Sequence, residues 1–173
     1  QIKRADMVIV TKMEGSEVLS SERERWRKAL KMREDSPLLF SRIAYRPLMP
    51  VMPGKEDSRY IYAKSAIVIS GIADDRSLRR GVGWSYSVAD VLCFRDHHGY
   101  RLSDISKVDA AVRRYPTAVV LTTEKDAQRL RSMEGVPVRV SSRLFYIPIE
   151  SEIIPDVNSG SYLEQELPEL GYN

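Results

Sequence analysis

The hydrophobic residues of this sequence fall into short runs separated by polar, helix-like stretches. Most runs are rich in β-branched residues and about four to eight residues long, which is typical of buried strands. We predict strands at 7–11, 38–45, 66–70, 88–94, 118–121, 138–140 and 144–147. Helices are predicted to begin near residues 22, 76, 103 and 124. This alternation predicts an α/β fold with a mostly parallel sheet flanked by helices.

Two helices carry recognisable end signals. Ser21, with Glu24 three residues later, has the form of a capping box, which predicts a helix over 22–34. Ser103 is typical of an N-cap, and Pro116 is expected to close the helix that follows it.

Residues 46–65 interrupt the alternation of strands and helices. The segment contains three prolines and a glycine: Pro47, Pro50, Pro53 and Gly54. Prolines at this density favour an edge strand or an excursion over a central strand. Arg59–Tyr62 is predicted to return as a second edge strand. We expect 46–65 to be a flap or hinge inside a domain of residues 1–150.

Charge is unevenly distributed along the chain. The net charge is +3, but residues 150–173 contain six acidic residues and no lysine or arginine. Residues 1–149 therefore carry 27 basic and 18 acidic side chains, and we expect 151–173 to be an acidic tail. A basic body suits anionic partners such as phosphates, nucleic acid or an anionic membrane surface. The alternative is that the charges only solvate helix faces.

Several features bound the class of protein. No apolar run approaches the roughly 18 residues of a membrane span, and no signal-peptide pattern is present. The single cysteine, Cys93, excludes an internal disulfide, and its apolar neighbours predict a small buried residue rather than a nucleophile. The chain begins at Gln1 and a strand-like run follows almost at once, so we expect a piece of a longer protein.

The only two histidines, His97 and His98, stand side by side after a predicted strand. Ligands of open α/β sheets bind at the carboxyl ends of the strands. A histidine there either hydrogen-bonds a loop or, beside Asp96, serves in acid–base chemistry. Two histidines and one cysteine, without metal-site spacing, are too few soft ligands for zinc, so no metal site is predicted.

A second polar segment, Thr122–Asp126, follows another predicted strand. Thr123 could N-cap the next helix, with acidic neighbours that complement the helix dipole. Alternatively, Lys125 and the N–H groups of the helix start hold an anion. Gly71, after the strand at 66–70, permits close approach of a ligand or a neighbouring element. No G-x-x-x-x-G-K-[ST] phosphate loop occurs in the sequence.

Four segments together resemble the C-terminal half of tetraacyldisaccharide 4′-kinase, the lipid A 4′-kinase of Gram-negative bacteria. They occur in the family's order: Arg4–Lys12, Ser70–Ala73, Phe94–Tyr100 and Thr122–Asp126. The third resembles the family's "FxDHHxY" and the fourth its "TTEKD". The chain departs from the family at Asp74-Asp75, where Asn-Pro is frequent, and at Met13-Glu14, where Cys-Pro is usual. The resemblance spans roughly residues 4–148.

The resemblance implies an ATP- and Mg-dependent kinase that phosphorylates the 4′-hydroxyl of the lipid A disaccharide 1-phosphate precursor. It implies two α/β/α domains joined by a β hinge, with the phosphate loop in an N-terminal domain that is absent here. It implies a peripheral location on the cytoplasmic face of the inner membrane. The expected partners are the lipid precursor, the anionic membrane surface and the missing domain, and no nucleic acid.

The motif positions also imply site residues. The family histidine that pairs with an aspartate of the missing half to activate the sugar hydroxyl corresponds to His97. Asp96 is the expected companion of this histidine in catalysis. Expected contacts to substrate or nucleotide come from Thr11, Lys12, Gly71, Thr123 and Lys125.

Two other functions stay open at this point. An Asp-His-His metal phosphoesterase would need more upstream aspartates for two metals, and only Asp6 lies near a strand. A non-catalytic module would bind an anionic partner through the basic body, with strong salt dependence and no turnover.

Overall fold

The computed structural model describes residues 2–71, 76–83, 85–96 and 98–155. The chain divides into two compact units, one of residues 1–44 with 150–173 and one of residues 45–149. The sequence predicts a different division, with one domain of residues 1–150 and an acidic tail of 151–173. The structure groups residues differently because residues 8–45 and 149–154 build a sheet and a core of their own.

The smaller unit is a three-stranded sheet with one helix packed on it. Its strand order is β1-β2-β8, and β1 and β2 are parallel. Its core is formed by Val18, Leu38, Phe40 and Ile154. Ile154 N donates a hydrogen bond to Phe40 O at 2.8 Å, which fixes the chain just after β8. The elements are η1 (Ile2–Arg4), β1 (Val8–Met13), α1 (Ser20–Leu30), β2 (Leu38–Tyr45) and β8 (Ile149–Ile153).

Both ends of α1 differ from the prediction. The helix begins after Leu19, whose carbonyl accepts from the N–H groups of Glu22 and Arg23. Ser21 already lies inside the helix and no side chain caps it, so the predicted capping box is wrong. The helix ends at Leu30 because Lys31 takes the left-handed conformation (φ 51°), with its N–H directed to the last carbonyls.

The larger unit is built on a five-stranded sheet of order β3-β7-β6-β4-β5. Neighbours from β7 to β5 are parallel, and only the short edge strand β3 is antiparallel. This confirms a mostly parallel sheet. The strands are β3 (Met49–Pro50), β4 (Ser65–Ser70), β5 (Ser87–Cys93), β6 (Val119–Thr123) and β7 (Leu144–Ile147). The helices are η2 (Ser58–Tyr62), α2 (Arg76–Gly83), α3 (Leu102–Arg114), α4 (Glu124–Arg131) and α5 (Val138–Ser141).

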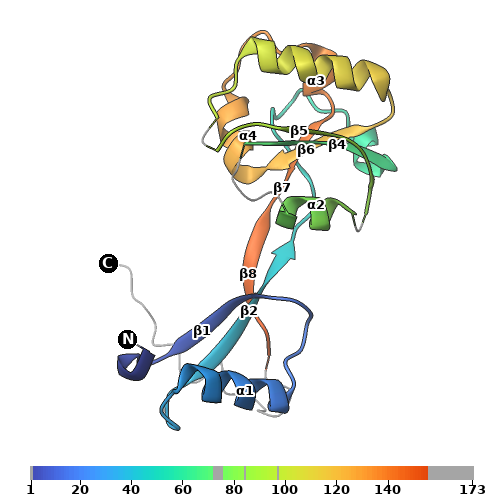
Figure 1. The fold of residues 1–173 in the computed structure, drawn as a ribbon. Coiled ribbons are helices and arrows are strands. Elements are labelled where there is room, and N and C mark those ends of the chain that lie inside the picture. Colours follow the sequence, from blue (N-terminus) through green and yellow to red (C-terminus); the bar gives the residue numbers. More distant parts are fainter. Residues whose placement is uncertain (1, 72–75, 84, 97, 156–173) are drawn as a thin grey trace. The chain divides into compact units, whose positions relative to one another are not determined.

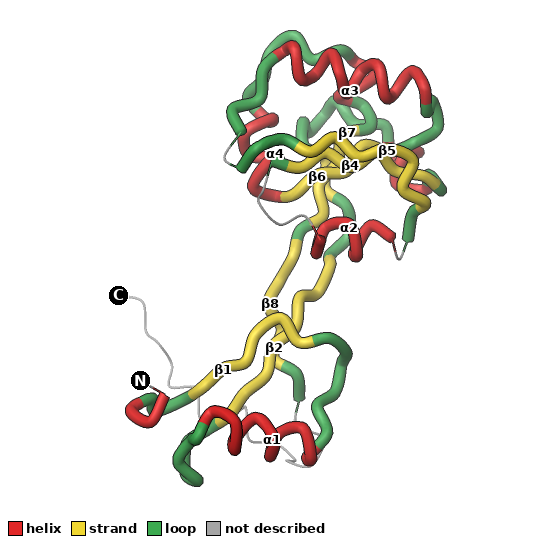
Figure 2. Tube along the Cα trace, viewed as in Figure 1, coloured by secondary structure: helices red, strands yellow, loops and turns green. Residues whose placement is uncertain are grey.

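Helices cover both faces of this sheet, with α3 on one face and α2 on the other (Figures 1 and 2). Side chains of a strand alternate between its two faces. In β4, Ile67 and Ile69 therefore join the core beneath α3, whereas Ala66 and Val68 join the core beneath α2. The helices add apolar side chains to these cores: Ile105, Val108 and Val112 from α3, Ala127 and Leu130 from α4, and Leu78 and Val82 from α2.

Besides the capping box, five local predictions are wrong. Ser103 is not an N-cap, because α3 begins at Leu102 and its N-cap is Arg101. Arg59–Tyr62 is helical, because the Asp57 side chain accepts from Arg59 N and starts the turn. Residues 138–140 form a helical turn whose N–H groups bond back to Pro137 O, instead of a strand. The start of the expected tail is strand β8. Cys93 is exposed because β5 is an edge strand, and its Sγ accepts a hydrogen bond from Arg79.

Candidate functional site at the carboxyl edge of the sheet

Three parallel strands of the larger unit end at one edge of the sheet. β4 leads into Gly71, β5 into Phe94 and β6 into α4, and the Phe94 N–H donates to Ser70 O at 2.7 Å. From β4 the chain continues through α2 to β5 on one side, and from β6 through α4 to β7 on the other side. The strands β4 and β6 therefore flank a topological switch point, which is where open α/β sheets bind ligands.

A buried carboxylate joins the ends of β4 and β6. Asp126 is fully buried, and its Oδ2 accepts hydrogen bonds from Gly71 N and Thr123 Oγ1, each at 2.9 Å. Asp126 N in turn donates to Thr123 Oγ1 at 3.1 Å, so Thr123 is the N-cap of α4, as predicted. Arg129 Nη1 lies 3.3 Å from the other carboxylate oxygen and balances the buried charge. A carboxylate with this many donors is well stabilised in the interior.

Gly71 leaves little room for a side chain. An added Cβ would lie 3.0 Å from Asp126 Oδ1, 3.1 Å from Tyr100 Oη and 3.3 Å from His98 Cβ. Of the two predicted reasons for a glycine here, the structure shows the close approach of neighbouring elements. The Gly71 N–H is also occupied by Asp126.

The turn after β5 presents Asp96 to the start of α4. Lys125 Nζ lies 3.9 Å from Asp96 Oδ1, and the two side chains are 48% and 42% exposed. The structure thus brings together two of the predicted site residues from different strand ends. An exposed pair at this distance adds about 0–1 kcal/mol to stability. It therefore contributes little to the fold and stays open to solvent.

The His98 side chain contacts Asp104, Phe94 and Tyr100. Its Nε2 lies 2.8 Å from Asp104 Oδ2, and the side chains are 27% and 7% exposed. The imidazole stacks on Phe94, with ring centroids 4.7 Å apart, and meets Tyr100 edge-on at 5.2 Å. The loop-bonding interpretation therefore applies to His98. His97, the predicted catalytic histidine, lies outside the described residues.

Burial and hydrogen bonding shift two pKa values beside this turn. Burial acts to raise the pKa of Asp104, but hydrogen bonds from His98, the Arg101 N–H and Lys107 outweigh it and hold the pKa below its usual range. Burial, followed by the negative charge of Asp126, raises the pKa of Tyr100 far above its ordinary value. Asp104 therefore stays ionised and Tyr100 stays protonated at neutral pH.

Sequence reasoning did not single out Asp104 or Tyr100, and it gave Asp126 only a helix-dipole role. A signal for Asp126 was present, because an acid three residues after an N-cap threonine reaches back to the cap. Asp104 occupies the matching place after Arg101 in α3.

Thr11 and Lys12, two further predicted contact residues, belong to the smaller unit. Both are exposed in β1, and Lys12 has a positive φ of 60° where the pairing with β2 is irregular. The residues described above at the carboxyl edge all belong to the larger unit.

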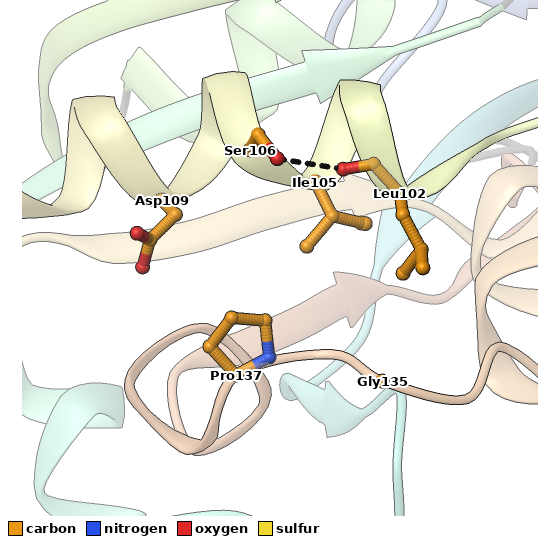
Figure 3. A pocket seen from close by; sticks show the side chains of 6 residues that line it. All are labelled: Leu102, Ile105, Ser106, Asp109, Gly135 and Pro137. Atoms are coloured by element: carbon orange, nitrogen blue, oxygen red, sulfur yellow. Dashed lines mark hydrogen bonds between the residues drawn. The ribbon is translucent and has the colours of Figure 1, made fainter.

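A separate hollow lies between α3 and the segment before α5 (Figure 3). Its volume is about 240 Å³, and its lining residues are Leu102, Ile105, Ser106, Asp109, Gly135 and Pro137. None of them was a predicted site residue. Asp109 is ion-paired with Arg113 and Arg139, and although burial acts to raise its pKa, these arginines hold it below the usual range.

The described ranges contain no group of three or more His, Cys, Asp or Glu side chains placed to hold a metal ion. In the same ranges, every helix is too short or too polar to cross a membrane.

The fold and the site define an α/β protein whose parallel strands end at the edge where open sheets of this kind bind ligands. The chain belongs to the tetraacyldisaccharide-1-P 4′-kinase family, whose model matches residues 1–167. This confirms the resemblance drawn from the four motifs.

Individual relatives agree with the family match. A tetraacyldisaccharide 4′-kinase of Parabacteroides distasonis is 32% identical over 153 residues, which cover 85% of this chain and 41% of that protein. One of Porphyromonas gingivalis is 27% identical, covering 90% of this chain and 44% of its own length. The chain thus spans under half the length of these relatives. A crystal structure of LpxK from Aquifex aeolicus in complex with ATP aligns with a TM-score of 0.46 at 16% identity, covering 85% of this chain and 47% of that one.

Proposed function

We propose that the whole protein is an ATP-dependent kinase that phosphorylates the 4′-hydroxyl of the lipid A disaccharide 1-phosphate precursor. This chain supplies the part of the catalytic cleft that carries Asp96 and His97. The family match over residues 1–167 carries the proposal, since the matched relatives are named tetraacyldisaccharide 4′-kinases.

In this proposal His97 accepts the proton of the 4′-hydroxyl as the oxygen attacks phosphorus. Asp96, beside it in sequence, orients the imidazole and keeps it basic. Lys125 and the first N–H groups of α4 hold an anionic phosphate of the nucleotide or the lipid. When bound, ATP would supply the phosphoryl group, with ADP as the leaving group, and Mg²⁺ would neutralise the negative charge that develops on the transferred phosphate.

The remaining predicted contact residues fall into two groups, one with a structural role and one that stays predicted to bind a ligand. The Gly71 N–H and the Thr123 hydroxyl already bond to Asp126, which supports a structural role for them beneath the site. Thr11 and Lys12 are exposed and stay predicted ligand contacts of the smaller unit.

Following the family resemblance, we propose that Mg²⁺ is held mainly by the more than half of the relatives' length that this chain does not span. The role given to this chain is to move a proton and to hold an anion, and no step of it runs through the metal.

We place the whole protein peripherally on the cytoplasmic face of the inner membrane. The support is the excess of basic residues in 1–149, which suits an anionic lipid surface. Co-sedimentation with phosphatidylglycerol vesicles, weakening as salt rises, is the expected result. Equal binding to neutral phosphatidylcholine vesicles would argue against it.

The rival functions are distinguished by simple assays. Manganese-dependent phosphoester hydrolysis without ATP would indicate the phosphoesterase, and salt-sensitive binding without turnover would indicate the non-catalytic module. The family match favours neither.

The test of the kinase proposal compares two proteins. The full-length protein should phosphorylate the lipid precursor with ATP and Mg²⁺, whereas the 173-residue chain should not, because it lacks a phosphate loop. ATP-dependent phosphorylation by the chain alone would overturn this division of roles.

A further inference from the structure

We propose that His98 is a positioning residue for the phosphoryl transfer: with Asp104 and Phe94 it clamps the turn that presents Asp96 to Lys125. The inference rests on the proposed function and adds a role for the second histidine. The ring and the backbone N–H of His98 contact other residues of this chain, so His98 does not itself touch the reacting atoms.

The turn is closed at its base. His98 N donates to Arg95 O at 3.1 Å, and the Phe94 N–H before it is bonded to Ser70 O at the end of β4. The side chains at the two ends of the turn are also in contact, because the rings of Phe94 and His98 stack with an interplanar angle of 20°. Asp96 lies between these fixed points, so its position depends on both.

The anchor of the clamp is rigid. Asp104 lies in the first turn of α3, a helix fixed to the sheet by Ile105 and Val108. Its carboxylate is 7% exposed and accepts from His98, from the Arg101 N–H at 3.1 Å and from Lys107 Nζ at 3.3 Å. Because these donors act on one buried group, the imidazole has little freedom to move.

On the opposite side of the turn, the contact between Asp96 and Lys125 is weaker. The Asp96–Lys125 contact is long, at 3.9 Å, and exposed to solvent. A pair of this kind does not hold a turn in place. The contact at His98 is the shorter and the more buried of the two, so it constrains the turn more strongly than the Asp96–Lys125 pair does. A displacement of about 1 Å at a reacting group can cost about 10²-fold in rate.

The experiment uses four variants of the full-length protein, each assayed for kcat, for KM of ATP and lipid, and for Tm. His98→Phe keeps the ring stack but removes the bond to Asp104. His98→Gln restores a donor that can reach Asp104. Asp104→Asn removes the anionic partner, and Asp109→Asn, a second ion-paired carboxylate of α3, is the matched control.

We expect His98→Phe and Asp104→Asn to lower kcat by about 10–100-fold, with each KM within about 2-fold of wild type. His98→Gln regains the donor but not the ring stack, so it should lose clearly less kcat than His98→Phe, and Asp109→Asn should keep wild-type kcat. Wild-type kcat in His98→Phe or Asp104→Asn, or a raised KM as the only change, overturns the proposal. So does a kcat loss in His98→Gln as large as in His97→Ala, because His98 would then be catalytic.

Failure of the underlying function is seen separately, as absence of lipid phosphorylation by the wild-type protein. The clamp is then judged by hydrogen exchange of the His98 amide, which donates within the turn. Exchange faster by at least about 10-fold in His98→Phe and Asp104→Asn, but not in Asp109→Asn, supports the clamp. Unchanged exchange overturns it.

Discussion

Two carboxylates at the same sheet edge, Asp126 and Asp96, have opposite surroundings. Asp126 is fully buried and bonded to Gly71, Thr123 and Arg129. Asp96 is 42% exposed and meets Lys125 at 3.9 Å. The buried acid joins two strand ends and has its oxygens occupied within the protein. The exposed acid is open to solvent, so a ligand can reach it. Asp126 with its partners is therefore the frame of the site, and the Asp96–Lys125 pair is its working surface.

The largest effect is expected in the turn that carries Asp96. His97→Ala in the full-length protein should lower kcat by about 10²–10⁴-fold, the usual range for loss of acid–base assistance. Tm should stay close to wild type, since the change is meant to act on the chemistry alone. Steady-state kinetics beside His98→Ala test the choice of histidine. If His98→Ala is equally or more harmful, the roles of the two residues have been exchanged.

Substitution of Asp126, the centre of the frame, should lower the free energy of unfolding. Asp126→Ala leaves the Gly71 N–H and the Arg129 guanidinium without their buried acceptor, which costs about 3–5 kcal/mol for a broken buried ion pair. Asp96→Ala is the matched control and should change the free energy of unfolding by about 1 kcal/mol or less. Urea unfolding of the 173-residue chain measures both. Similar losses in the two variants would contradict the distinction between frame and working surface.

Much of this arrangement is visible in the sequence because it depends on local chemistry. The apolar run at 38–45 became β2 with the predicted bounds, and Thr123 caps α4 as its place before Glu124 and Asp126 indicated. The meeting of Asp96 with the start of α4 follows from parallel strands ending at one edge.

The rest depends on contacts between distant segments. The bond from His98 to Asp104 requires the turn after β5 to fold back onto the first turn of α3. The glutamates of β8 make its sequence look like the start of an acidic tail, although the strand completes the β1-β2-β8 sheet. The β-branched residues Val138 and Val140 favour a strand, but Pro137 and the pairing of β7 with β6 and β3 leave them in a helical turn.

A third prediction concerns pH and the Asp104 side of the site. The pKa of Asp104 is lowered in the folded protein, so its stabilisation is fully present above its unfolded pKa of about 3.9 and is lost as pH falls through the lower folded value. Asp104→Asn should therefore be less stable than wild type by about 1–3 kcal/mol at pH 7, the range for hydrogen bonds to a charged group. The difference should shrink below about pH 4. Urea unfolding at pH 7 and pH 3 checks it, and a gap that grows on acidification would contradict the sign.

The smallest effect is expected for Lys125, the partner of Asp96 on the working surface. Lys125→Ala should change the free energy of unfolding by about 0–1 kcal/mol, because the ion pair is exposed. A cation in the first turn of a helix is disfavoured by the helix dipole, so its presence there favours a bound anion as its purpose. The full-length variant should therefore show a raised KM for ATP or for the lipid with Tm unchanged, and Lys125→Arg should retain part of the affinity. If both KM values and Tm stay at wild type, Lys125 is a surface lysine and takes no part in binding an anion at the start of α4.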